Sequence, residues 1–127
     1  MTDGLKPVDL TVVDTLSEAW QDFPLPAINA HLEFIPLLND PETGVLVAKI
    51  VYRAGFTNTW HTHPCGHGIY VLDGTLNTHQ GTFGPGSFVW FPEGGTMEHG
   101  ATEDADCTFL FITNKAFDIH HVATAHG

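Results

Sequence analysis

The stretch His61-Thr62-His63-Pro64-Cys65-Gly66-His67, with Gly55 before it and Gly74 after it, places three imidazoles within seven residues. Alternate side chains of an extended strand share a face, so His61 and His63 point the same way. Pro64 and Gly66 favour a turn, after which His67 precedes the apolar run Ile69–Leu72. The pattern predicts that His61, His63 and His67 converge on one metal ion inside a small β-barrel.

The alternative is a set of exposed loop histidines. If these rings are instead buried beside Trp60, Ile69 and Tyr70 without a bound ion, each unpaired ring nitrogen costs about 1–3 kcal/mol. The apolar neighbours and the flanking glycines therefore favour the metal site.

The composition predicts a single domain, 1–127, that acts on small molecules. Of its 127 residues 43% are hydrophobic, and 15 acidic against 4 basic side chains give a formal charge of -11. This charge argues against nucleic acid and anionic membranes as partners. The first residues, Met1–Lys6, lack the basic and then apolar layout of a signal peptide, and no apolar run is long enough to span a membrane. We therefore expect a cytoplasmic protein.

The two cysteines, Cys65 and Cys107, do not form a disulfide or zinc pattern. We expect both to be reduced. Cys65 lies between two proposed ligands, where a thiolate role is conceivable, but a small packing role is the simpler interpretation.

Short β-branched and aromatic runs separated by glycine and proline predict an all-β fold. Ser17–Asp22 is the one helical candidate, at most a turn or two before Pro24 and Pro26. We expect an N-terminal arm at 1–30, a barrel at 31–113 and a C-terminal tail at 114–127. The predicted strands are a hairpin of His31–Leu38 and Gly44–Tyr52, then the histidine strand, Gly68–Leu72, Thr75–His79, Ser87–Phe91 and Thr108–Ile112.

The glycine and histidine spacing over residues 44–112 resembles the cupin superfamily, whose members are double-stranded β-helices, or jelly-roll barrels. The first cupin motif fits Gly55, five residues, His61-Thr62-His63, three residues, His67, six residues and Gly74, with His67 at the position of a glutamate. The second motif fits Gly86, five residues and Pro92-Glu93-Gly94, but Met97 occupies the usual histidine position and His99 follows two residues later.

Three residues compete for the fourth ligand position. His99 is favoured, because imidazole suits iron, manganese, nickel and zinc, and a shift of two residues keeps the same strand face. Glu98 is the main rival, although strand alternation points it away from His99. Met97 would favour copper(I) and is better explained as an apolar wall of the pocket. The predicted metal set is thus His61, His63, His67 and His99, and His99 and Glu98 are the candidate catalytic residues.

A set of neutral imidazoles leaves the full positive charge on the ion, which favours anionic substrates that chelate through two oxygens. We expect a divalent transition metal, iron(II) first, with manganese, nickel or zinc as alternatives. Through Tyr70–Leu72, Val89-Trp90 and the histidines, the chain resembles the small cupin dioxygenases that act on acetylacetone or dihydroxyacetophenone. The resemblance implies a non-haem iron dioxygenase that cleaves a carbon–carbon bond in a small diketone or hydroxyketone.

A second resemblance, carried by Trp60–Pro64 and Gly66, is to the cupin hydroxynitrile lyases, in which His67 falls at a glutamine position. It implies a lyase or isomerase in which the metal is a Lewis acid, oxygen takes no part, and His99 is free to carry a proton. A non-catalytic metal or small-molecule binding module is the third hypothesis.

Other side chains are expected to serve the scaffold. We predict that His79, His120, His121 and His126 are solvated. Arg53 and Lys49 are expected to pair with acidic side chains, the alternative being that either meets a substrate carboxylate. The aromatic residues of the strands are expected in the barrel core or at the interface of a homodimer, and they are Trp60, Tyr70, Phe88, Trp90, Phe109 and Phe111.

Overall fold

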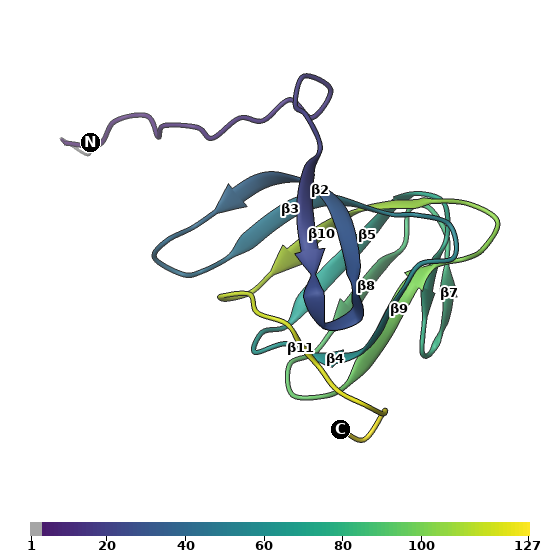
Figure 1. The fold of residues 1–127 in the computed structure, drawn as a ribbon. Helices are drawn as coiled ribbons and strands as arrows, with labels where there is room; N and C mark the ends of the chain where they lie inside the picture. The colour runs from purple at the N-terminus through teal and green to yellow at the C-terminus, as the bar shows by residue number, and fades with distance from the viewer. Residues whose placement is uncertain (1–3) are drawn as a thin grey trace.

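The computed structural model describes residues 4–127, which form two antiparallel β-sheets that enclose one core (Figure 1). One sheet has the strand order β1-β2-β3-β10-β5-β8, and the other has the order β11-β4-β9-β6-β7. The strands are β1 Gln21–Leu25, β2 Ala30–Asn39, β3 Leu46–Tyr52, β4 Thr57–Thr62, β5 His67–Asp73, β6 Leu76–Thr78, β7 Gly81–Phe83, β8 Phe88–Phe91, β9 Met97–Ala101, β10 Cys107–Thr113 and β11 His120–His121.

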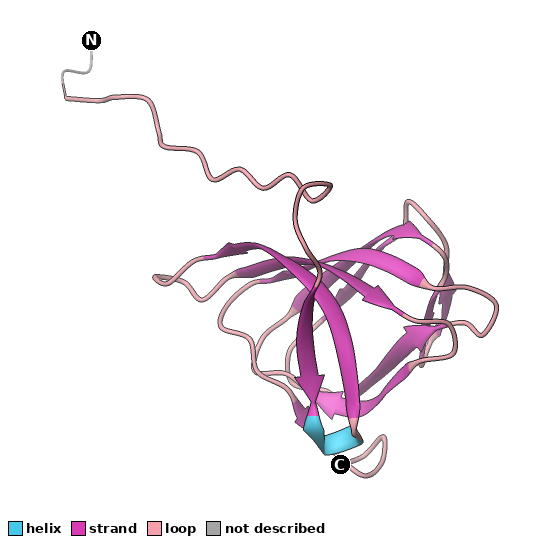
Figure 2. Cartoon of the chain, turned by 45° about the horizontal axis from the view of Figure 1, so that its top comes forward, coloured by secondary structure: helices cyan, strands magenta, loops and turns pink. Residues whose placement is uncertain are grey.

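The two sheets exchange strands along the chain, and this confirms the predicted all-β jelly roll. β4, β9 and β11 belong to one sheet, whereas β5, β8 and β10 belong to the other, so the chain crosses repeatedly between layers (Figure 2). The predicted hairpin is present as β2 and β3, with Asn39 opposite Leu46. No helix in the described part of the chain is long and apolar enough to cross a membrane.

Alternation along β5 and β10 builds the core between the sheets. Ile69, Val71 and Phe109 are fully buried, and Phe111 is nearly so. Cys65 and Cys107 are both free and fully buried, in agreement with the packing role expected of Cys65. The interior between these strands is therefore apolar, so a polar side chain buried there needs a hydrogen-bond or metal partner.

The N-terminal region differs from the prediction. Residues 15–18 form turns rather than a helix, and β1 begins at Gln21, inside the stretch expected to be an arm. β1 pairs with β2 along its whole length, from Gln21 opposite Phe34 to Leu25 opposite Ala30. Pro24 is tolerated because β1 is an edge strand, where a missing N–H leaves no ladder bond unmade. Residues 1–3 of the predicted arm lie outside the described residues.

The aromatic residues divide between the two faces of the six-stranded sheet. Phe109 and Phe111 point into the core as expected, whereas Tyr70, Phe88 and Trp90 are exposed on the outer face, and Trp60 is half-buried. Each exposed ring alternates with a buried or half-buried neighbour on its strand. The part of the outer face formed by β5 and β8 is thus apolar and exposed in the single chain.

The scarce basic side chains serve the scaffold. The Arg53 guanidinium donates to both Glu33 carboxylate oxygens, each at 2.7 Å, and to Asp106 Oδ2 at 2.9 Å. These two acids raise the pKa of Arg53, and the predicted acid pairing is confirmed there. Lys49 instead contacts the Thr15 hydroxyl and the Trp20 ring.

Candidate metal centre

Three histidines from two neighbouring strands meet inside the barrel. His61 lies near the end of β4, His63 follows just after it, and His99 lies on β9, which pairs with β4. Their exposed fractions are 0%, 5% and 2%. One ring-nitrogen ligand atom from each lies within 4.8 Å of the others. The convergence of His61, His63 and His99 that the sequence predicts is present.

A bulge in β4 changes which of its side chains point into the barrel. Asn58 is opposite His99 and His61 is opposite Met97, so three steps along β4 match two steps along β9. In a regular strand Asn58 and His61 would lie on opposite faces, but here both are buried. The bulge therefore adds an inward amide beside the imidazoles that strand alternation cannot predict.

Each imidazole of the cluster is held through its Nδ1 atom. His61 Nδ1–H donates to the Thr59 carbonyl and His63 Nδ1–H donates to the Asp118 carbonyl, both at 2.6 Å. Because a carbonyl can only accept, the proton of the neutral ring is fixed on Nδ1 and the Nε2 lone pair stays free. His99 Nδ1 lies 3.0 Å from the Tyr52 hydroxyl, which completes the set.

The free Nε2 atoms are the ones that face the centre. Among the described residues, His61 Nε2 and His99 Nε2 are buried and have no hydrogen-bond partner. Burial lowers the pKa of His61 to about 4 and also lowers the pKa values of His63 and His99, with smaller contributions from neighbouring imidazoles. Neutral rings with inward lone pairs are the form in which histidine binds a metal, so the cluster fits a divalent transition ion.

His67, the fourth predicted ligand, lies next to the three grouped histidines, with its ring centroid 4.9 Å from that of His63 and 5.8 Å from that of His99. It is fully buried at the start of β5, but its Nε2 lies 3.3 Å from Met97 Sδ. Its ring stacks on Phe91 at 4.6 Å between centroids, with an interplanar angle of 16°. Burial lowers its pKa to about 2. β5 belongs to the sheet opposite β4 and β9, so His67 approaches the three histidines from across the core.

The two rival ligands on β9 behave differently. Met97 is 3% exposed and belongs to the apolar core, which agrees with its expected role as a wall. Glu98 is half-buried, and its side chain lies on the strand face opposite to His99 by alternation. Within residues 4–127, the gathered ligand atoms are those of the three histidines, so the structure does not bring Glu98 to the centre.

A narrow apolar cavity reaches the cluster from the side of β1, β2 and β3. The space open to the centres of water molecules is about 50 Å³, and His63, His99, Tyr52 and Asn58 lie at its polar end. Its remaining walls are apolar side chains of β1 to β3 and β10, together with Phe117 and Ile119 from the C-terminal segment. The cavity thus offers room for a small apolar group next to the imidazoles.

The model of the ChrR cupin-like domain family matches residues 8–118, which is most of the chain. This protein is a cupin. A curated relative, the (R)-mandelonitrile lyase of Granulicella tundricola, is 30% identical over 86 residues, which are 63% of this chain and 66% of the lyase. The chain therefore spans slightly less than two thirds of that relative's length.

Solved structures show the same fold at low identity. An RmlC-like cupin from Ralstonia eutropha JMP134 matches with a TM-score of 0.77 at 15% identity, over 94% of this chain and 76% of its own. A candidate acetylacetone dioxygenase from Methylibium petroleiphilum PM1 matches with a TM-score of 0.74 at 14% identity, over 97% of this chain and 88% of its own.

The cupin site also uses residues that sequence reasoning missed. His121, expected to be solvated in the tail, is half-buried in β11, where it pairs with His61 of β4. Its ring lies 5.5 Å from the His61 ring, and its Nε2–H donates to Asn58 Oδ1 at 2.7 Å. A two-residue strand has no periodicity, so no sequence signal could have found it. His79, His120 and His126 are exposed as predicted.

Tyr52, Asn58 and Asp118 are the other missed contributors. Tyr52 is buried and stacks on His99, with 5.8 Å between ring centroids. Burial raises the pKa of its hydroxyl, while a hydrogen bond with Asn58 opposes this shift. Two hydrogen-bonded pairs, His99 with Tyr52 and Asn58 with His121, thus lie beside each other between the buried cluster and the edge of the barrel.

Proposed function

We propose that this cupin is a metal-dependent enzyme that breaks or forms a carbon–carbon bond beside an oxygen-bearing carbon in a small, largely apolar substrate. The observation that carries the proposal is a cluster of three buried, neutral imidazoles, two of which, His63 and His99, line an apolar cavity. Buried polar clusters at the end of an apolar pocket are the usual form of a small-molecule site.

His61, His63 and His99 would hold a divalent transition ion, because their free Nε2 lone pairs face one another. Imidazole suits iron, manganese, nickel and zinc, with iron(II) the metal expected from the sequence. When bound, such an ion would supply Lewis acidity toward a carbonyl or hydroxyl oxygen. The carbonyls of Thr59 and Asp118 would keep His61 and His63 in the ligating tautomer, and the Tyr52 hydroxyl would orient the His99 ring.

The first candidate reaction is lyase chemistry without oxygen, of the cyanohydrin type. It is supported by the 30% identity to a mandelonitrile lyase together with the walls of the cavity, where the rings of Phe23, Phe34, Phe111 and Phe117 could receive an aryl group. In such a cleavage the bond between the carbinol carbon and the nitrile carbon breaks, and the electron pair leaves with cyanide. The hydroxyl proton is lost, so the products are an aldehyde and hydrogen cyanide, and no oxidant is consumed.

The second candidate is oxygen-dependent cleavage of a small diketone or hydroxyketone, as expected from the sequence. It is favoured by the cluster of neutral ligands without a carboxylate, because such a set leaves the charge of the ion available to an enolate. The same apolar cavity would accept the alkyl or aryl groups of a diketone.

One experiment separates the two candidates. Protein purified without a histidine tag is analysed for bound metal and then assayed under argon with mandelonitrile, and in air with acetylacetone and a dihydroxyacetophenone. Aldehyde release under argon that depends on the metal supports the lyase. Oxygen uptake that depends on iron supports the dioxygenase.

The proposal fails if stoichiometric metal supports neither reaction while substrate analogues still bind tightly, since that result describes a binding module. It also fails if turnover persists after the metal is removed. His79→Ala replaces an exposed histidine in the turn between β6 and β7. It is the control for unspecific effects of removing an imidazole.

A further inference from the structure

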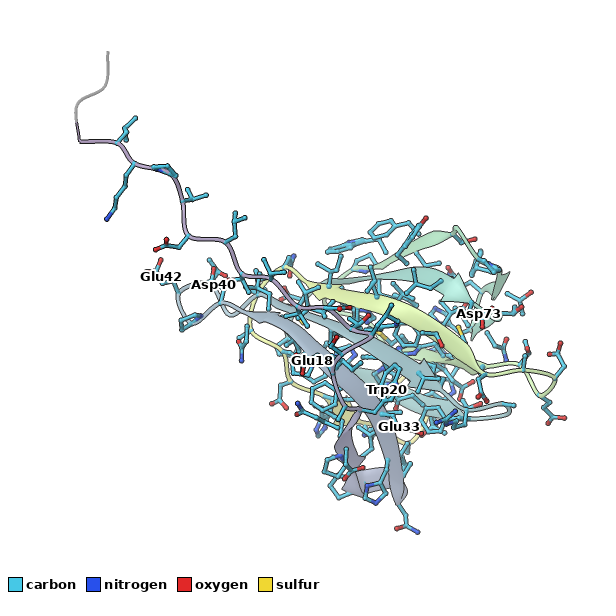
Figure 3. The ribbon with its side chains drawn as sticks, turned by 90° about the horizontal axis from the view of Figure 1, so that it is seen from above. Glu18, Trp20, Glu33, Asp40, Glu42 and Asp73 are labelled. Carbon is cyan, nitrogen blue, oxygen red and sulfur yellow. The ribbon has the colours of Figure 1, made fainter. Side chains whose placement is uncertain are left out.

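The outer face of the six-stranded sheet is covered along one half and bare along the other. Residues 15–20 lie over β2 and β3, where the Thr15 hydroxyl is 3.4 Å from Lys49 Nζ and the same Nζ is 5.9 Å from the centre of the Trp20 ring (Figure 3). Ile35, whose side chain shares this side of the sheet with its partner Lys49, is 2% exposed. The N-terminal segment therefore covers the part of this half around Ile35 and Lys49, whereas Leu38 near the end of β2 is 41% exposed.

The other half, formed by β10, β5 and β8, presents a floor of apolar side chains that we call the aromatic floor. Its exposed members are Tyr70, Leu72, Phe88, Trp90 and Ile112, with exposed fractions between 37% and 58%. None of these side chains carries a charge, although the chain as a whole carries -11. The floor thus adds no charge of its own to the repulsion between two acidic chains, which makes it the favourable face for their approach.

The floor is shaped by glycines of β5 and the turn before it. A Cβ atom at Gly68 would lie 2.6 Å from the Phe88 ring, and one at Gly66 would lie 2.6 Å from the Trp90 ring. The two rings are close to parallel, with an interplanar angle of 24° and 6.5 Å between centroids. Both rings can therefore lie flat along the sheet only because these positions have no side chain.

The N-terminal arm, residues 4–14, has the complementary character. Val8, Leu10 and Val12 alternate along an extended segment and are 78–80% exposed, and Leu5 is 76% exposed. The arm leaves the body of the molecule and extends into solvent (Figures 1 and 2). A row of aliphatic side chains at a spacing of two residues matches the pleat of a strand or a sheet surface.

The direction of the arm is fixed where it joins the covered half of the face. Leu16 N–H and the Ser17 hydroxyl donate to the two carboxylate oxygens of Asp14, and Ser17 N–H donates to the Asp14 carbonyl, all at 3.0 Å. Held by this turn, the arm leads away from the body rather than back across the sheet face (Figures 1 and 2). Ten extended residues reach about 33 Å, whereas the three strands of the floor are about 15 Å across, so the arm can span the floor of a neighbour.

We propose that the N-terminal arm of one copy docks on the aromatic floor of a second copy, and that the exchange is reciprocal in a twofold homodimer. Two equivalent arm-to-floor contacts follow from one symmetry axis. Each contact buries aliphatic side chains of the arm against Tyr70, Phe88 and Trp90. The inference concerns assembly, and it stands or falls independently of the proposed enzymatic function.

The test is the mass of the full-length protein in solution, measured by light scattering between 1 and about 100 micromolar. We expect twice the chain mass of 13.8 kDa. Leu10→Asp in the arm and the double variant Phe88→Ser with Trp90→Ser in the floor should each raise the dimer dissociation constant about 30-fold or more. All three residues are exposed in the single chain, so circular dichroism and the unfolding midpoint should stay close to wild type.

Thr11→Asp is the matched control, because it adds the same charge to the opposite edge of the same segment, and it should leave the dimer intact. A wild-type monomer at the highest concentration overturns the proposal and would leave the floor to another partner or to the chain's own arm. A dimer that survives either the arm or the floor variants also overturns it, since the contact would then lie elsewhere.

Discussion

Four buried histidines lie close together in this cupin, and His67 differs from the other three in what holds its ring. His61, His63 and His99 each place Nδ1 against an oxygen atom, which leaves Nε2 pointing at a common centre. His67 has no partner for Nδ1 among the described residues, and its Nε2 contacts the sulfur of Met97. The difference teaches that buried imidazoles of one core can be oriented in different ways, because the second hydrogen bond decides where the lone pair points.

The largest expected effect is the loss of metal when a cluster histidine is replaced. His61→Phe removes one of three inward lone pairs, so the affinity for the metal should fall by more than about 100-fold and activity should be lost with it. Elemental analysis of the purified protein measures the first and turnover the second. His63→Ala provides a smaller substitution if the phenyl ring perturbs folding. Full metal occupancy in both variants would show that the three-histidine cluster does not hold the metal.

The second prediction concerns acid stability without metal. Burial lowers the pKa of His61 to about 4 and of His67 to about 2, so the folded protein keeps these rings neutral while the unfolded chain takes up protons below about pH 6.5. Stability should therefore fall as the pH drops below 6.5, by up to about 1.4 kcal/mol per pH unit for each such histidine.

Urea unfolding of the metal-free protein at pH 7.5, 6.5, 5.5 and 4.5 measures this slope. Bound metal should flatten it, since a ligated nitrogen cannot accept a proton. His67→Phe should remove the contribution of one histidine. A stability that does not change between pH 7.5 and 4.5 would contradict the assignment of neutral buried rings.

The third prediction tests the hydrogen bond that orients His99. Tyr52→Phe keeps the ring and removes only the hydroxyl, so the metal affinity should fall by about 10- to 100-fold. Competition with a chelator of known affinity gives the number. Tyr70→Phe, on the exposed outer face, is the matched control and should bind metal as the wild type does. Equal affinities for both variants would show that the Tyr52 contact has no orienting role.

The smallest effect is expected at His67. His67→Phe substitutes a flat ring that can still stack on Phe91, and the structure gives that position no part in the three-histidine cluster. Metal content should stay within about twofold of wild type, with a stability change within about 1.5 kcal/mol. Loss of metal comparable to that in His61→Phe would restore the four-histidine set predicted from the sequence.

Much of the scaffold was predictable because it rests on local rules. Glycine and proline mark the turns, and alternation or apolar runs mark β2 to β6, β8 and β10, whereas the short β7 and the polar β9 were not among the predicted strands. Period two nevertheless gives His61 and His63 one face. β1 escaped because its prolines argue against a strand until its edge position is known. β11 escaped because two residues carry no pattern.

The comparisons with known proteins change the emphasis of the functional hypotheses. The sequence motifs favoured a dioxygenase first and a lyase second, whereas the curated relative at 30% identity favours the lyase. Both hypotheses use the same imidazoles and the same cavity. The assay under argon is therefore the decisive one between them.

The sequence by itself determined the jelly roll, the inward face of the histidine strand and the neutral character of the donors, because these depend on residue type and on a period of two. Only the tertiary structure decided which lone pairs converge. The oxygens that fix the rings come from a bulge at Thr59, from Tyr52 on the opposite sheet and from Asp118 near the C-terminus, and such partners become neighbours only when the barrel closes.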